Sequence, residues 1–407
     1  MKIATKDLNL EATKDFLNYF YAALRNNSLG LFDAGGRGHF SDSGYESNLR
    51  LGIANPKEKL FIINLKLSFN HEGCLQSIES YADSHEESNQ WGTILSNFIN
   101  EVLLSTISQK KEKFFVRNYF AAISGTNLNG EYWLPGFRFA PLMPEDDSQL
   151  IGSERYVVID QEIDAIDDSH AVLLAEQKAS LFTAHLSLLL NIGLYKPSKK
   201  YKWYSKHDKN GIKQFRESTL LYDFNHQVKM PKKNTICKLG EFRGSVFQYE
   251  FIGNNDFSCP TETRKILKVI KCSDQKIQKA FDRCATLYQI GLNVGQFYNT
   301  AMISYFYASI DAITKSLKGE YKGFKDFITK NYKEDVEDII NFIHDDIRSA
   351  HFHAGALKLD EENFRVDHLT NIDFHKQNYL VKESIRIIRK SIFNWILESI
   401  AKNEKKI

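Results

Sequence analysis

The chain has 407 residues, which is enough for two or three domains of ordinary size and for a large buried core. Lys and Arg number 53 against 51 Asp and Glu, and the resulting net charge of +2 excludes a protein that coats nucleic acid with its whole surface. Apolar residues at 43% and only 7 prolines exclude a disordered or collagen-like architecture, so we expect a globular protein whose basic surfaces are local.

The five cysteines form no C-x-x-C pair, and their number is odd. This pattern is typical of neither a zinc site nor a secreted disulfide framework, so we expect a cytoplasmic protein without metal or other cofactor. The longest uncharged run, residues 179–195, contains His185 and Asn191 and is short for a membrane span. We expect this run to be a buried helix and the protein to have no membrane partner.

Residues 1–260 alternate between helical and strand-like patterns, which predicts a mixed α/β region of unknown fold. The spacing of apolar residues predicts helices at 11–26, 90–108 and 171–190, and strands at 60–69, 113–123 and 155–160.

The glycine-rich residues 35–38 have two interpretations. A phosphate-binding loop would end in Gly-Lys-Ser/Thr and follow an apolar strand, and neither feature is present. A flexible loop is therefore favoured, and a nucleotide-binding first region stays as the weaker alternative.

Residues 145–168 hold nine acidic residues against one Arg. A metal site is one interpretation of this density. The strand-like run at 155–160 alternates its faces, and Asp167 and Asp168 stand where the first turn of the next helix favours negative charge. We therefore favour a solvated strand face followed by a helix cap.

The charge reverses at residues 196–216, which hold eight cations and one Asp interleaved with aromatic residues. Ammonium groups bind phosphates and aromatic rings stack on bases, so this pattern suits a nucleic-acid strand. The alternative is a surface hairpin whose lysine side chains extend into solvent and bind no ligand. The candidate RNA contacts here are Lys199, Lys200, Lys202 and Trp203.

A hairpin at 235–252 and a linker at 254–263 are predicted to close the first region. Four amphipathic stripes follow, at 277–292, 303–317, 336–347 and 381–396. Such helices are not stable alone, so we expect them to bury one another as a four-helix bundle in a domain spanning 264–407. The predicted fold class is therefore α+β.

The connection at 315–333 carries six lysines and several aromatic residues. Lys322 and Lys325 are further candidate RNA contacts. A lid packed over the bundle is the alternative interpretation of this connection.

The third predicted helix ends in a polar cluster before Gly355, a natural stop signal. Arg348 and His353 stand there, where the helix carbonyls concentrate negative potential. Arg348-x-x-x-x-His353, at the end of the third helix of four, resembles the motif of the HEPN superfamily of helical ribonucleases, and within it the Apea-like domains of bacterial anti-phage proteins. The likeness covers about residues 264–403 and is supported by Asp311 in Ala-Ser-Ile-Asp-Ala-Ile.

The resemblance implies a metal-independent endoribonuclease in anti-phage or stress defence. A His and an Arg are sufficient to cleave RNA without metal, because RNA supplies its own nucleophile, the ribose 2′-hydroxyl. The imidazole accepts the proton of this hydroxyl, and the guanidinium neutralises the negative charge of the phosphate. The products would carry a 2′,3′-cyclic phosphate and a 5′-hydroxyl. The implied catalytic residues are Arg348 and His353, with Asp311 orienting one of them and His351 as a secondary contributor.

Arg348 and His353 would lie about 140° apart on a regular helix, so one protomer is not expected to bring both to one phosphate. The resemblance therefore implies a homodimer with a composite site. The expected partners are RNA, tRNA among them, and a phage-derived or cellular trigger sensed by residues 1–260.

Three alternatives stay open. The Arg and His residues at the end of the third predicted helix can form a charge network with Asp345 and Asp346 that has no catalytic role. His344 and His351 can hold a metal, although no third ligand is evident. The helical domain can be an inactive module for dimerisation and for binding RNA or protein.

Overall fold

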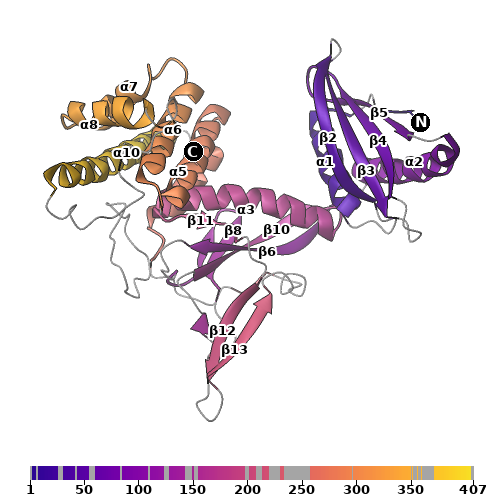
Figure 1. The fold of residues 1–407 in the computed structure, drawn as a ribbon, viewed down its shortest axis with the longest axis horizontal. Coiled ribbons are helices and arrows are strands. Elements are labelled where there is room, and N and C mark those ends of the chain that lie inside the picture. The colour runs from indigo at the N-terminus through magenta and orange to yellow at the C-terminus, as the bar shows by residue number, and fades with distance from the viewer. Residues whose placement is uncertain are drawn as a thin grey trace. The chain divides into compact units, whose positions relative to one another are not determined.

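The computed structural model describes residues 2–5, 8–25, 31–41, 44–54, 60–82, 85–108, 111–122, 128–142, 149–150, 155–197, 201–207, 213–219, 230–232, 257–295, 297–349, 351, 355, 359 and 371–404. These residues form an α+β protein, as predicted (Figure 1). The chain divides into two compact units, residues 1–116 with 162–177 and residues 117–161 with 178–407. The predicted hairpin at 235–252 lies outside the described residues.

The first unit contains an antiparallel sheet in the order β1-β5-β4-β3-β2, with two helices on one face (Figure 1). Apolar residues of α1 and α2 pack on alternate residues of the central strands, such as Leu65 and Leu67. The bounds are β1 Lys2–Ala4, α1 Leu10–Arg25, β2 Leu31–Ser41, β3 Gly44–Ala54, β4 Leu60–Phe69, β5 Leu75–Ala82 and α2 His85–Ser108. The predicted helices at 11–26 and 90–108 and the strand at 60–69 are confirmed.

The expectation of a flexible loop at residues 35–38 is wrong, because these residues belong to β2. The strand pairs with β3 through a register shift between Asp33 and Gly36. The phenol of Tyr45 on β3 lies against Gly38, where a Cβ atom would clash with it. Gly38 therefore leaves room for the side chain of Tyr45 on the neighbouring strand, a role that only the strand pairing reveals.

The sheet β11-β6-β10-β8-β7 follows, and the division between the units passes through β6, β10 and α3. The bounds are β6 Glu112–Ala122, β7 Tyr132–Leu134, β8 Phe137–Pro141, β10 Arg155–Ala165, α3 Asp168–Leu190 and β11 Leu194–Tyr195. The predicted elements at 113–123, 155–160 and 171–190 are therefore present, with β10 five residues longer than expected. A third sheet, β13-β12-β9, consists of Lys213–Thr219, Tyr201–His207 and Gln149–Leu150.

The acidic stretch at 145–168 is only partly the solvated face and cap that we expected. Asp167 does cap α3, since its Oδ1 accepts the backbone N–H of His170 at 2.7 Å. Glu162 and Asp164 are exposed on β10. Asp160, however, is fully buried between Arg117 on β6 and Arg138 on β8. Its charge is neutralised by two guanidinium groups rather than by water.

The helices of the second unit share one hydrophobic core with α3 and with strands of the second sheet. α5 lies beside α6, and η2, α7 and α10 also pack on α6 (Figure 1). The predicted apolar stripes are buried, including Phe281, Phe306, Ile343 and Ile388. The bounds are α4 Glu262–Cys272, α5 Gln275–Val294, α6 Asn299–Ser316, α7 Phe324–Asn331, α8 Glu337–Asn341, η2 Phe342–Arg348 and α10 Ile372–Glu404.

α10 is tied to the end of α3 by a buried arginine. Arg389 is 3% exposed, and its guanidinium donates to the carbonyl oxygens of Leu188 at 2.8 Å and Leu189 at 3.3 Å. These carbonyls have no partner within their own helix, so a cation from the last helix satisfies them.

Among the described helices, none has the length and apolar character needed to cross a membrane.

His170 is a buried histidine of the first unit. It is fully buried beside the ring of Tyr19, and its Nδ1 accepts the backbone N–H of Ile166 at 3.4 Å. Burial lowers the pKa of His170 below 6.5, against the opposing charges of Asp15 and Asp167. The neutral ring is therefore the form that fits the folded state.

We expect His170 to make the protein less stable in acid. As the pH falls through 6.5, the unfolded chain binds a proton that the folded chain does not, so stability decreases with falling pH. His170→Gln should flatten the dependence of the melting temperature on pH between about pH 7 and pH 5. His71→Gln, which changes an exposed histidine of the same unit, is the control. Equal pH profiles for His170→Gln and the unmodified protein would contradict this expectation.

Candidate functional site

Arg348 is the last residue of η2, a π-helical turn that follows α8. Ile343 and Ile347 of the same turn are fully buried, which leaves Arg348 half-buried at the edge of the core. Its Cζ lies 5.4 Å from the centre of the Tyr307 ring on α6. π-Helical turns occur frequently at functional sites because they change the faces on which successive side chains emerge.

Tyr307 is the centre of an aromatic cluster at this corner. Its ring stacks on Phe324 of α7 with centroids 4.3 Å apart, and the imidazole of His344 lies edge-on at 5.9 Å. Burial raises the pKa of Tyr307 to about 12; the negative charge of Asp311 acts in the same direction, and the positive charge of Arg348 opposes it. The phenol is therefore neutral at physiological pH.

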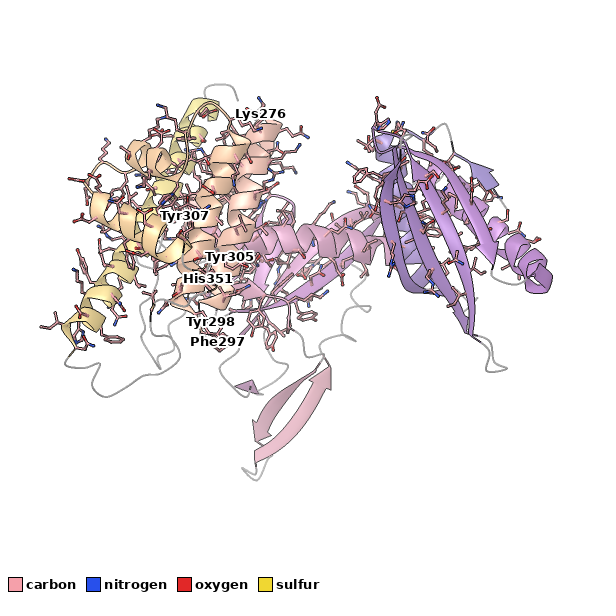
Figure 2. The ribbon with its side chains drawn as sticks, turned by 45° about the horizontal axis from the view of Figure 1, so that its top comes forward. Lys276, Phe297, Tyr298, Tyr305, Tyr307 and His351 are labelled. Atoms are coloured by element: carbon pink, nitrogen blue, oxygen red, sulfur yellow. The ribbon has the colours of Figure 1, made fainter. Side chains whose placement is uncertain are left out.

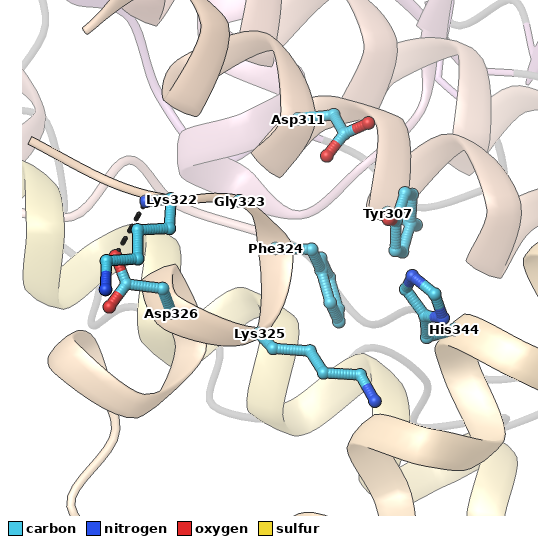
Figure 3. Close-up of a pocket in the computed structure, with 8 residues that line it drawn as sticks. All are labelled: Tyr307, Asp311, Lys322, Gly323, Phe324, Lys325, Asp326 and His344. Atoms are coloured by element: carbon cyan, nitrogen blue, oxygen red, sulfur yellow. Dashed lines mark hydrogen bonds between the residues drawn. The ribbon is translucent and has the colours of Figure 1, made fainter. Parts of the chain in front are cut away.

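A cavity of about 350 Å³ opens at this cluster (Figure 3). This volume falls within the range of roughly 300–1,000 Å³ that is typical of small-molecule sites. Aromatic rings form part of its wall, and charged side chains of both signs form the rest. The residues that line it are Tyr307, Asp311, Lys322, Gly323, Phe324, Lys325, Asp326 and His344.

Two exposed lysines lie at the cavity, on the segment that contains α7. Lys325 Nζ donates to Asn341 Oδ1 at 2.8 Å, which connects α7 to α8. The backbone N–H of Lys322 donates to Asp326 Oδ2 at 2.8 Å (Figure 3). That hydrogen bond, together with the nearby Lys330, lowers the pKa of Asp326. The aromatic residues of the same segment, Phe324 and Phe327, are buried, so its apolar side chains pack in the core while its lysines stay in solvent.

Asp311 lies one helical turn after Tyr307 on α6. It is partly buried, and its Oδ2 is 3.6 Å from Nζ of Lys315 in the next turn. Among the described residues, no carboxylate forms an ion pair with Arg348. The aromatic ring of Tyr307, rather than the carboxylate of Asp311, therefore contacts the guanidinium of Arg348.

The histidines of this corner have different surroundings. His344 Nδ1 pairs with Asp345, and this hydrogen bond lowers the pKa of Asp345. His351 follows η2 and is half-buried (Figure 2). The described residues contain no group of three His, Cys, Asp or Glu side chains that could hold a metal ion.

Four of the residues predicted from sequence therefore gather at one corner, namely Arg348, Asp311, Lys322 and Lys325. His351 is near the end of the same helical segment. Lys202 and Trp203 belong to β12, in a separate sheet. His353, Lys199 and Lys200 lie outside the described residues.

Sequence reasoning missed Tyr307, which contacts Arg348, His344 and Phe324. Its signal is the spacing of four residues that places it one turn after Ile303 and one turn before Asp311. A tyrosine on a buried helical stripe usually brings a polar group to the edge of a core. Phe297 and Tyr298, before α6, are two further exposed aromatic residues that no periodicity distinguished (Figure 2).

Several groups of this corner suit the binding of a phosphate ester. A guanidinium stacked on a ring keeps the donors along its edge available to phosphate oxygens. An imidazole beside the ring can accept or return a proton. A search of protein-family models, of curated proteins and of solved structures found no match to this chain.

Proposed function

We propose that the protein is a cytoplasmic, metal-independent endoribonuclease of HEPN type, and that its C-terminal helices form the HEPN-like four-helix bundle. The observation that carries this proposal is the position of Arg348, stacked on Tyr307 at a corner that also holds His344 and Asp311. The corner combines a permanent cation with an imidazole, which are the two kinds of group that RNA cleavage without metal requires.

The reaction begins with the ribose 2′-oxygen attacking the adjacent phosphorus. One histidine of the composite site takes the 2′-hydroxyl proton, and the bond from phosphorus to the 5′-oxygen breaks as that oxygen receives a proton from a second, protonated histidine. Arg348 donates to the non-bridging oxygens, where negative charge increases in the transition state. His353 is the base that the family likeness implies, and His344 is an imidazole whose ring contacts that of Tyr307.

The working form is a homodimer. Each protomer contributes one Arg348 corner, and a two-fold axis beside it brings two guanidinium groups and their histidines to one phosphodiester. Residues 1–260 act as the regulatory region that responds to a phage-derived or cellular trigger, because an unrestrained ribonuclease would damage the RNA of its own cell.

Cleavage of total tRNA by the full-length protein in excess EDTA tests this function. We expect new fragments whose 3′ ends carry a 2′,3′-cyclic phosphate. A matched RNA with a 2′-O-methyl group at the cleaved nucleotide should stay intact, because it lacks the nucleophile. Cleavage that requires added magnesium would contradict the mechanism, and binding of RNA without any cleavage would favour a non-enzymatic module.

A further inference from the structure

The small sheet β13-β12-β9 carries four of the eight cations of the basic segment, residues 196–216. β12 and β13 pair as an antiparallel hairpin with a continuous register from Tyr201–Thr219 to His207–Lys213. β9 pairs with the other edge of β12.

The register divides the hairpin residues into two faces. Residues directly opposite each other on antiparallel strands share a face, and successive residues of a strand alternate. The first face contains Lys202, Tyr204, Lys206, Gln214, Arg216 and Ser218. The second face contains Tyr201, Trp203, Ser205, His207, Lys213, Phe215, Glu217 and Thr219.

The two faces differ in chemistry. The first face has three cations, no carboxylate and one aromatic residue, Tyr204, which pairs with Arg216. The second face has three aromatic residues, and its single lysine shares that face with Glu217. Lys202 and Trp203, which the sequence suggested as joint contacts, therefore belong to opposite faces. One ligand surface cannot use both.

The first face has the dimensions of a short nucleic-acid site. Lys202 and Lys206 are four residues apart, which is about 13 Å along a strand. A stacked polynucleotide strand places a phosphate about every 3.4 Å, so the face spans roughly four nucleotides. A charge row without carboxylates complements a polyanion, and the ring at its centre favours a polynucleotide with unpaired bases over a polysulfate or a lipid surface.

We infer that the face formed by Lys202, Tyr204, Lys206 and Arg216 binds the phosphate backbone of single-stranded RNA. The choice of RNA over DNA rests on the proposed function, whereas the charges and the ring point to a single polynucleotide strand. The face is separate from the corner of Arg348 and supplies affinity rather than chemistry. Lys213 and Trp203 take no part in it.

The test uses the full-length protein and a fluorescent 2′-O-methyl oligonucleotide, which binds but lacks the nucleophile for cleavage. Its affinity is measured by anisotropy over a range of salt concentrations. In the triple variant Lys202→Ala/Lys206→Ala/Arg216→Ala we expect the slope of log affinity against log salt to decrease by about 2, from three contacts of about 0.7 each. At about 0.1 M salt this corresponds to a loss of roughly 100-fold in affinity.

Arg216→Ala and Lys213→Ala form a matched pair, because each removes one cation from β13, on opposite faces. Arg216→Ala should weaken binding and lower the salt slope, and Lys213→Ala should change neither. The charge-conserving triple variant Lys202→Arg/Lys206→Arg/Arg216→Lys should keep the affinity, because the same three positions of the first face still carry cations.

An unchanged salt slope in the alanine triple variant would overturn the inference, as would equal effects of Arg216→Ala and Lys213→Ala. If a DNA oligonucleotide of the same sequence binds with the same affinity as the 2′-O-methyl oligonucleotide, the choice of RNA over DNA is overturned. If the face binds as expected but the protein cleaves no RNA in any assay, the proposed function fails while this binding surface stands.

Discussion

Replacing Arg348 by alanine is expected to lower the rate of RNA cleavage by roughly 100- to 1,000-fold, the usual effect of removing one positioned donor from a transition-state site. Arg348→Lys should recover only part of this rate, because an ammonium group keeps the charge but not the two-pronged geometry. The measurement is the initial rate of tRNA cleavage in EDTA at equal protein concentration.

The control for Arg348 is Arg283→Ala, which removes an exposed arginine of α5 in the same helical region. It should leave the rate unchanged. Both variants should melt near the temperature of the unmodified protein, because the contact of Arg348 with Tyr307 is worth only about 0.5–1 kcal/mol. Cleavage by Arg348→Ala at the original rate would place the chemistry elsewhere in the protein.

Replacing Asp160 by alanine is expected to destabilise the fold by about 3–5 kcal/mol, because it leaves two partly buried guanidinium groups without their common partner. Asp160 accepts from Arg117 Nε at 2.7 Å and Nη2 at 3.0 Å, and from Arg138 Nη1 at 2.6 Å. Arg138 Nε also donates to Glu131 at 2.6 Å, so one network joins β6, β8 and β10.

The pKa of Arg117 reflects two opposing effects, burial and the interaction with Asp160. Burial alone lowers it, but the hydrogen bonds and the charge of Asp160 reverse this effect and raise the pKa of the guanidinium above its usual value. The cation therefore persists inside the sheet, and removing its partner leaves a charge that cannot be discharged at neutral pH. Replacing the whole network by apolar residues would cost much less than removing Asp160 alone.

Urea unfolding followed by circular dichroism measures the effect of Asp160→Ala. Glu162→Ala is the control, because it removes an exposed carboxylate two residues further along β10. We expect Glu162→Ala to shift the unfolding midpoint very little, as is usual for surface substitutions. A loss below about 1 kcal/mol for Asp160→Ala would show that water or other side chains replace the carboxylate.

The sequence alone determined the elements whose signal is local. Apolar residues at steps of three and four predicted α1, α2, α5, α6 and α10, and the alternating run at 60–69 predicted β4. These signals are strong because the faces of a helix or strand follow directly from the spacing of residues along the chain. The side-chain cap at Asp167 was equally accessible, since it depends on residues three positions apart.

The tertiary structure decided the features that depend on distant partners. Residues 35–38 became a strand because β3 pairs with them, and Asp160 became a buried anion because two arginines from other strands surround it. The cavity beside Tyr307 required α7 and η2 to pack against α6. Residue types and spacing identified Arg348 and Asp311, but only packing between distant segments gave them Tyr307 as a common neighbour, because burial and contact depend on the whole fold.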